Sequence, residues 1–257
     1  MLRFSSLGSG SRGNATLVEA GNTCVMVDCG FSVSETQRRL VRLGKSPGDI
    51  HAILVTHEHS DHIGGVAAFA RRFGIPVWMT AGTSVMLNAT DFPSLDGPVR
   101  FDGHTPFAIG DLQVTPFPVP HDAREPCQFV LSDGAVRLGV LTDTGSITAH
   151  IHQQLTGCQA LLLECNHDAA MLADGPYPPS LKQRVGGRLG HLSNHQAAEL
   201  LAALDTSQLT HLVAAHLSDK NNRSELARQA LADALGCDPG WIGVADQTEG
   251  LAWRQVG

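Results

Sequence analysis

Segment 56–62 constrains this chain more than any other, because it places three histidines and an aspartate directly after an apolar run at 51–55. The run has the composition of a strand buried on both faces, and residues two apart in an extended segment project the same way. The first two histidines can therefore bind one cation, and the aspartate and last histidine, where a helix is expected to begin, can face a second. Burying these groups without ligands would be costly, which disfavours a solvated polar loop. The candidate ligands are His57, His59, Asp61 and His62.

A metal site needs more ligands than one turn supplies, and the chain offers three at equivalent places. His121, Asp143 and His216 each follow an apolar run that is predicted to be a strand, and each precedes residues that favour turns. Any one of them alone is equally well explained as an ordinary loop residue. Their recurrence at three strand ends favours a site for two cations.

The composition limits the partners of the chain. Its 257 residues include 13 histidines but one tyrosine, which indicates metal chemistry, and the formal net charge is −7. A nucleic acid would therefore need a local basic patch or metal ions to bind. The six cysteines form no C-x-x-C pair, which indicates buried, reduced thiols. No stretch has the pattern of a signal peptide or a membrane helix, so we expect a cytoplasmic protein with no membrane partner.

The periodicity predicts a strand-rich first half, followed by alternating strands and helices. Gly21-Asn22 and Asp133-Gly134 favour hairpin turns. The predicted strands cover residues 2–7, 14–20, 23–28, 51–55, 76–79, 99–101, 106–109, 112–118, 127–132, 135–141, 159–164, 209–215, 241–245 and 250–256. No linker divides the sequence, so we expect one domain over residues 1–257, with two packed sheets and helices outside.

Four helices are predicted from periodicity and capping signals. In the helix at 34–43, Arg38, Arg39 and Arg42 are expected to face water. The second helix is expected to run from about Ile63 to Gly74. The third covers 195–204 behind the caps Ser193 and Asn194, and the fourth covers 224–235, between a capping box of Asn222 with Glu225 and a stop at Gly236.

The H-x-H-x-D-H motif with a later His, Asp and His resembles the metallo-β-lactamase fold superfamily of hydrolases, and the resemblance covers nearly the whole chain. It implies an α/β (α+β) fold, a four-layer αββα sandwich with the site at one edge. It also implies that His57, His59 and His121 hold one metal, that Asp61, His62 and His216 hold the other, and that Asp143 bridges them. Imidazole ligands suit Zn²⁺, while carboxylates also admit Mn²⁺ or Fe²⁺.

The ligand set separates branches of this superfamily. The antibiotic-hydrolysing members use a Cys where Asp143 stands, and the diiron oxygen-reducing members carry a Glu where His59 stands. A complete motif with a bridging Asp resembles the phosphodiesterases and the glyoxalase II-type thioesterases.

Residues 190–222 resemble the closing segment of the transfer-RNA 3′-processing nucleases. There, a His before a helix protonates the leaving oxygen and a Glu from an earlier strand end holds it, which implies His191 as the acid and Glu164 as its partner. The competing interpretations are a histidine near a helix cap and a structural carboxylate. No long Gly/Pro-rich arm is present, which counts against transfer-RNA processing itself.

The motifs taken together resemble the YycJ/WalJ-like subfamily, which is often described as exonuclease-like. The resemblance implies DNA hydrolysis, with attack on the 5′ ends of a duplex as one form of it. The residues that carry it are 9–14, the Pro120-His121-Asp122 turn, 164–168, Tyr177-Pro178, 190–194 and 216–222.

Substrate contacts are predicted from less specific signals. The Gly-rich loop at 8–14 could hold a phosphate or form only a tight turn. Lys182, Arg184 and Arg188 could form a basic rim or a solvated helix face. The candidate substrate-binding residues are Ser9, Ser11, Asn14, Asn166, His167 and Asn194.

The chemistry of such a site can be stated from general principles. Two cations about 3.5–4 Å apart lower the pKa of a shared water, which then attacks phosphorus in line with the leaving oxygen. An acid such as His191 contributes about 10²–10⁴-fold. Together with this chemistry, the resemblance implies a DNA nuclease with Asp61, His191 and Glu164 as catalytic residues. The alternatives are a hydrolase of small cyclic phosphodiesters or thioesters on the same site, and a metal-binding module without catalysis.

Overall fold

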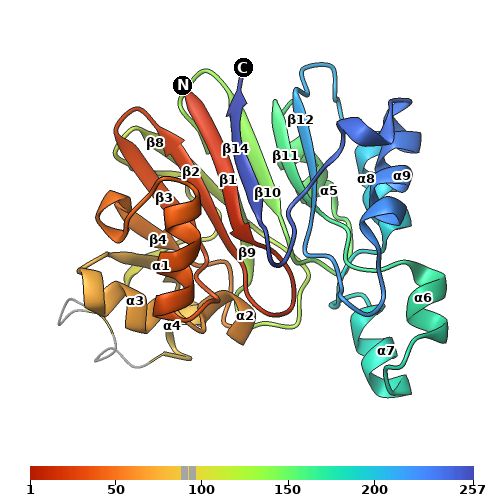
Figure 1. Ribbon diagram of the computed structural model, residues 1–257, viewed down its shortest axis with the longest axis horizontal. Helices are drawn as coiled ribbons and strands as arrows, with labels where there is room; N and C mark the ends of the chain where they lie inside the picture. Colours follow the sequence, from red (N-terminus) through yellow and green to blue (C-terminus); the bar gives the residue numbers. More distant parts are fainter. Residues whose placement is uncertain (88–91, 93–96) are drawn as a thin grey trace.

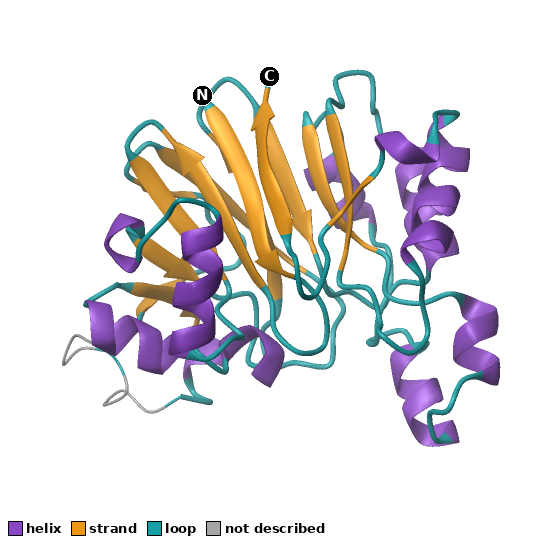
Figure 2. Cartoon of the chain, viewed as in Figure 1, coloured by secondary structure: helices purple, strands orange, loops and turns teal. Residues whose placement is uncertain are grey.

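The computed structural model describes residues 1–87, 92 and 97–257. Its strands form two sheets of seven, and helices lie on the outer faces of both (Figures 1 and 2). The strand order is β14-β1-β2-β3-β4-β5-β6 in the first sheet and β13-β12-β11-β10-β9-β8-β7 in the second. Because β1 pairs antiparallel with β14, the two ends of the chain lie side by side (Figure 1).

The strand bounds follow the predicted runs closely. The first sheet contains β1 (Leu2–Gly8), β2 (Ala15–Ala20), β3 (Thr23–Val27), β4 (Ala52–Leu54), β5 (Val77–Thr80), β6 (Val99–Phe101) and β14 (Leu251–Val256). The second contains β7 (Phe107–Ile109), β8 (Leu112–Pro118), β9 (Cys127–Ser132), β10 (Arg137–Leu141), β11 (Ala160–Glu164), β12 (His211–Ala215) and β13 (Gly243–Val244). Both predicted hairpins form, with Gly21 at φ 54° and Gly134 at φ 91°.

The helices lie outside the sheets. They are α1 (Val33–Arg42), α2 (Ser60–Ile63), α3 (Val66–Phe73), α4 (Ala81–Ser84), α5 (Ala149–Leu155), α6 (Ala169–Asp174), α7 (Pro179–Val185), α8 (Asn194–Ala203) and α9 (Ser224–Leu235), with 3₁₀ turns η1 (Pro47–Asp49) and η3 (Pro239–Trp241). None of the helices in the described ranges is long and apolar enough to cross a membrane.

Three apolar clusters hold the layers together. The central cluster, with Phe4 and Phe129 among its largest members, fills the space between the sheets. A second lies between the first sheet and helices α1 and α3, and includes Phe69. The third lies between the second sheet and helices α5, α8 and α9, and includes Leu200 and Leu231. This is the predicted four-layer αββα sandwich.

Parallel pairing brings the polar strand ends together. Strands β3 to β6 are parallel neighbours in the first sheet, and β10 to β13 are parallel neighbours in the second. The carboxyl ends of parallel strands meet at one edge of a sheet. The loops that follow β4, β10, β11 and β12 therefore converge at the lower edge of the sandwich in Figure 1.

The predicted helix from Ile63 to Gly74 is wrong in one respect, because the chain forms α2 and α3 instead. Gly64 ends α2, and Gly65 lies so close to Phe31 that a Cβ there would stand 1.9 Å from the Phe31 carbonyl oxygen. The backbone approaches the neighbouring loop too closely at this point for any side chain, so only glycine fits at the break between the two helices.

Two further expectations from the sequence are wrong, and three helices were missed. Arg39 does not face water: it is buried, and its guanidinium donates to the carbonyl oxygens of Leu7 and Gln247. Asn222 does not cap α9: Arg223 holds the N-cap position, without a side-chain hydrogen bond. Helices α5, α6 and α7 were not predicted, since each has seven residues or fewer and shows little periodicity.

Candidate metal centre

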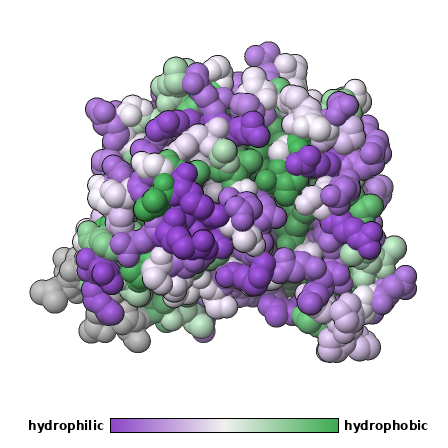
Figure 3. Space-filling model, viewed as in Figure 1, coloured by the Kyte–Doolittle hydropathy of each residue, from purple (hydrophilic) through white to green (hydrophobic). Residues whose placement is uncertain are grey.

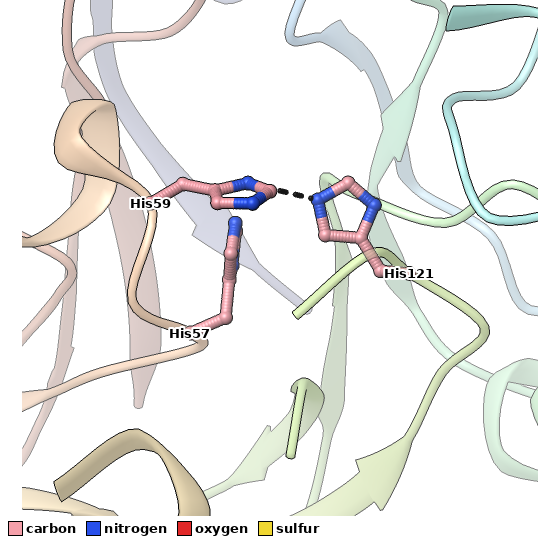
Figure 4. Close-up of side chains that lie close together, drawn as sticks. All are labelled: His57, His59 and His121. Atoms are coloured by element: carbon pink, nitrogen blue, oxygen red, sulfur yellow. Dashed lines mark hydrogen bonds between the residues drawn. The ribbon is translucent and has the colours of Figure 1, made fainter. Parts of the chain in front are cut away.

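Three histidines from two loops form the first cluster of ligand-type atoms (Figure 4). His57 and His59 follow β4 in extended backbone, and His121 follows β8 from the other sheet. His121 Nε2 lies 3.2 Å from His59 Nδ1, and the His57 ring stands with its edge toward both (Figure 4). Ring nitrogens of the three histidines therefore face a common point, where one cation could bind to all three.

A second cluster lies beside the first. The Nε2 atoms of His62 and His216 each lie 3.3 Å from Asp61 Oδ2. Asp61 and His62 are in the single turn of α2, and His216 follows β12. The sequence-based grouping of these three residues is therefore matched by their positions in space.

Asp143, which follows β10, lies between the two clusters. Its Oδ2 is 3.3 Å from His62 Nε2, and its Oδ1 is 3.9 Å from His121 Nε2 and 3.6 Å from His216 Nδ1. Asp143 Oδ2 and His57 Nε2 are both buried and have no hydrogen-bond partner. Buried polar atoms are normally paired, so these two atoms fit a pair of cations. The seven residues together supply imidazole and carboxylate ligands of the type that divalent metals take.

Electrostatics within the clusters follows from burial and from the opposed charges. Burial would raise the pKa of Asp61, but hydrogen bonds from His216 and His62 outweigh it and hold that pKa well below its usual range. Burial likewise acts against the positive charge on His216, yet Asp143 and Asp61 raise its pKa to about 10. For His57, burial dominates and lowers the pKa well below its usual value. Carboxylates and imidazoles thus stabilise one another's charges, as bound cations would do for the carboxylates.

The backbone is strained at two places in this site. Asp28, which follows β3, has φ 61° and His216 has φ 54°, and they are the two described non-glycine residues with positive φ. Asp28 Oδ2 accepts a hydrogen bond from His62 Nδ1 at 2.7 Å, which turns His62 Nε2 toward Asp61. Such conformations persist where the surrounding structure holds them, and they are common at functional sites.

His191 and Glu164 lie next to the clusters as a hydrogen-bonded pair. Glu164 is the last residue of β11 and is fully buried, and its Oε1 accepts from His191 Nδ1 at 2.7 Å. Its Oε2 accepts from the amides of Thr144 and Leu192. With both oxygens bonded inside the protein, Glu164 is suited to orient His191, whose Nε2 remains for other contacts.

A cavity of about 400 Å³ opens over the clusters. One wall is formed by α7 and the segment before it, through Tyr177, Leu181 and Arg184. Ser11 and Ser218 also line the cavity. The floor is formed by candidate ligands and by His191, through His59, Asp61, Asp143, His191 and His216.

The structure brings only part of the predicted substrate-binding set to this cavity. Ser11 and Asn166 line it. Ser9 and Asn14 instead hold candidate metal ligands in place. Ser9 accepts a hydrogen bond from the His216 amide, and Asn14 donates one to Asp61. His167 is buried and does not line the cavity.

Asn194 also lies away from the cavity over the clusters. Its amide exchanges two hydrogen bonds with Asn222, whose Nδ2 also donates to the Cys165 carbonyl. These bonds tie the start of α8 to the segment before α9. The position of Asn194 therefore favours a structural role over contact with substrate.

Two parts of the site were not found from the sequence. Asp28 directly follows the buried strand β3, the same signal that led to His121, Asp143 and His216, and it could have been found in that way. The ion pair between Arg184 and Asp122, at 2.6 Å, joins α7 to the loop that carries His121. In the sequence Arg184 is one of three basic residues before His191, and no local pattern predicts its partner.

The fold and the site define the chain as a metal-dependent hydrolase of the metallo-β-lactamase fold. A family model described as Beta-lactamase superfamily domain matches residues 23–216, and the chain belongs to this family. It is 36% identical over 240 residues to a protein named exodeoxyribonuclease YycJ from Bacillus anthracis, a match that covers 91% of this chain and 89% of the relative. A protein named exodeoxyribonuclease WalJ from Streptococcus pneumoniae is 33% identical, with 91% and 88% covered. The chain therefore belongs to the YycJ/WalJ family.

Solved structures with low sequence identity share the fold. The metallo-β-lactamase fold protein YhfI from Bacillus subtilis matches with a TM-score of 0.75 at 14% identity, covering 98% of both chains. The short form of human tRNase Z matches with a TM-score of 0.68 at 16% identity, covering 99% of both. These likenesses confirm the predicted sandwich.

Proposed function

We propose that this chain is a two-metal phosphodiesterase that degrades DNA from an end, an exodeoxyribonuclease. The observation that carries the proposal is the meeting of two ligand clusters at Asp143, with the His191–Glu164 pair beside them. Relatives that are named exodeoxyribonucleases and align over nine-tenths of the chain support the choice of DNA.

In this proposal the two clusters hold two divalent cations, Zn²⁺ or Mn²⁺, with Fe²⁺ also compatible. When bound, such cations supply Lewis-acid stabilisation of phosphoryl oxygens and activation of water. The first would be held by His57, His59 and His121 and the second by Asp61, His62 and His216, with Asp143 between them. The cations would also offset the net charge of −7, which otherwise repels a polyanion.

The protein's own contribution to the chemistry lies in His191. Because Nδ1 is bonded to Glu164, the proton available to a substrate is the one on Nε2, and His191 lines the cavity. In the proposed reaction His191 Nε2 gives this proton to the departing alkoxide oxygen. Glu164 stabilises the charged imidazole and keeps its orientation.

The walls of the cavity bind and orient the substrate. Ser11 offers a hydroxyl group, Asn166 lines the cavity while its amide donates to the His216 carbonyl, and Arg184 is the arginine among the described lining residues. Loop 8–14 contacts the candidate ligands more than the cavity. Asn14 donates a hydrogen bond to Asp61, and Ser9 accepts one from the His216 amide, so the loop holds both residues in place. Substrate contacts from this loop are therefore assigned to Ser11 alone.

The test is a comparison of substrates under one condition. Metal-loaded protein is offered 5′-phosphorylated duplex DNA, single-stranded DNA, RNA, a cyclic phosphodiester and a thioester. We expect release of nucleotides from DNA ends, and loss of this activity in Asp61→Ala. Asp233→Ala, which removes an exposed carboxylate on α9, is the matched control and should retain full activity.

Each competing function has its own outcome in this test. If the cyclic phosphodiester or the thioester is turned over faster than any nucleic acid, the substrate is a small molecule and not DNA. Metal binding without turnover of any of the five substrates would indicate a binding module. Full activity of Asp61→Ala would contradict the assignment of the metal centre.

A further inference from the structure

A second cavity, of about 380 Å³, lies at an open edge of the sandwich, away from the metal centre. Strand β14 is the edge strand of the first sheet and β13 that of the second, and the cavity lies where these edges face one another, beside η3 and α9. Its lining includes Thr210 at the start of β12, whereas His216 follows the end of that strand. Val213 of the same strand also lines the cavity, so at about 3.3 Å per residue the two sites come within roughly 10 Å of one another along β12.

The floor of this cavity is lined by aliphatic residues, although most of the surface that the cavity exposes is polar. It is formed by side chains of the strands and of η3, and Figure 3 shows apolar surface between the elements that Figure 1 labels β14 and α9. The residues of the floor are Leu212, Val213, Ile242, Val244 and Leu251. Trp241 also lines the cavity, and 44% of its surface is exposed, which is unusual for so large a side chain.

The rim of the cavity is basic. Arg228 from α9 and Arg254 from β14 both line it, and none of its described lining residues is acidic, although the whole chain carries −7. Arg228 Nε is buried and has no hydrogen-bond partner. His211 does not add a donor, because its Nε2 is already bonded to the Gln255 carbonyl.

A buried guanidinium nitrogen without a partner points to an anionic ligand. Leaving such a donor unpaired is costly, and arginine matches phosphate better than any other side chain does. The exposed side chain of Trp241 adds a platform on which a flat aromatic ring can stack. The volume lies in the range of small-molecule sites.

We propose that this cavity binds a nucleotide, with the phosphate at Arg228 and Arg254 and the base against Trp241. A nucleotide combines an anionic group with a flat aromatic ring, which is the combination that the lining presents. The ligand can be a free nucleotide or one unit of a nucleic-acid strand. The proposal does not depend on the activity at the metal centre.

Binding can be measured at Trp241 itself. The chain has three tryptophans, so the ¹H–¹⁵N spectrum of the metal-loaded protein contains three indole signals, and Trp241→Phe identifies the one from this cavity. Adenosine 5′-monophosphate should shift that signal saturably. Adenosine alone and inorganic phosphate alone should each bind at least about tenfold more weakly, since each lacks one half of the contacts.

Matched variants test the role of the arginines. Arg228→Ala and Arg254→Ala should each weaken binding of the monophosphate by about tenfold or more. Arg223→Ala removes the same charge from the start of α9, but Arg223 lines a different cavity. The affinity of this variant for the monophosphate should therefore be unchanged. No shift of the Trp241 signal at millimolar monophosphate would overturn the proposal. Equal affinities of the Arg228 and Arg223 variants would overturn it too.

A last arm separates the two sources of the ligand. A phosphorothioate oligodeoxyadenylate, which resists hydrolysis, is titrated in the same way. Binding that is more than tenfold tighter than that of the monophosphate assigns the cavity to a nucleic-acid strand. Equal or weaker binding assigns it to a free nucleotide.

Discussion

His191 Nδ1 lies 2.7 Å from Glu164 Oε1, and this contact fixes which imidazole nitrogen faces the substrate. If His191 protonates the leaving oxygen, His191→Ala should slow hydrolysis of DNA by about 10²–10⁴-fold. Hydrolysis of a nitrophenyl phosphodiester should fall much less, since nitrophenolate leaves without a proton. Rates on both substrates with equal metal content check this, and equal losses would remove the role as acid.

Metal removal should lower both activity and stability. Removing the metals with a chelator leaves His57 Nε2 and Asp143 Oδ2 buried without partners. It also leaves the negative charges of the neighbouring carboxylates to repel one another. A ligand that binds only the folded state stabilises it, by about 2.7 kcal/mol at a concentration of 100 times Kd. We expect a lower melting temperature after chelation, and its recovery on adding Zn²⁺ or Mn²⁺. If chelation leaves the melting temperature unchanged, and mass spectrometry finds no metal bound to the protein, the assignment of these clusters as a metal site is contradicted.

Asp28 should control metal affinity without touching a metal. Its bond to His62 Nδ1 orients the ring, and loss of such a bond typically costs about 10–100-fold in metal affinity. Asp28→Asn removes the charge but keeps a side chain that tolerates the positive φ at this position. Competition with a chromophoric chelator measures the affinity, and Asp233→Asn serves as the surface control. Equal affinity of the two variants would show that His62 does not need this partner.

The residues of the candidate metal centre could be picked out from the sequence because each carries a local signal. Segment 56–62 is dense in ligands, and His121, Asp143 and His216 each follow an apolar run, so that strand pattern and residue type point to the same positions. The sandwich followed from the same runs. The central strands are short and almost wholly buried, and hydrophobicity marks such strands clearly.

The parts that escaped prediction depend on contacts between distant segments. Arg39 reads as a surface arginine on a helix, and only the approach of Leu7 and Gln247 makes its burial favourable. Asn194 is the first residue of α8, close to His191 in the sequence, and its side chain pairs with Asn222 away from the cavity over the clusters. A sequence pattern describes neighbours along the chain, whereas these bonds join residues 28 to 208 positions apart.

Arg39 should contribute to stability far more than Arg38, its neighbour on α1. Arg39→Ala leaves the Leu7 and Gln247 carbonyls without these bonds and removes a guanidinium that lies 4.0 Å above the Phe31 ring. We expect a loss of about 2–4 kcal/mol in the free energy of unfolding. Arg38→Ala, which breaks a surface pair with Glu35, should cost less than about 1 kcal/mol. Urea unfolding measures both, and similar losses would mean that the burial of Arg39 contributes nothing.

Glu35 gives the fold a pH dependence of known sign. Hydrogen bonds from Arg38 and Arg39 lower its pKa from 4.5 to about 2. A carboxyl with a lower pKa in the folded state adds stability that is fully present above its unfolded pKa and is lost as the pH falls toward the folded one. Between pH 4.5 and pH 2, the stability difference between the wild type and Glu35→Gln should therefore shrink as the pH falls. Melting temperatures of chelated wild type and variant across this window test it, because the other carboxylates are common to both proteins and cancel. A difference that stays constant or grows on acidification would show that Glu35 is not held ionised by the two arginines.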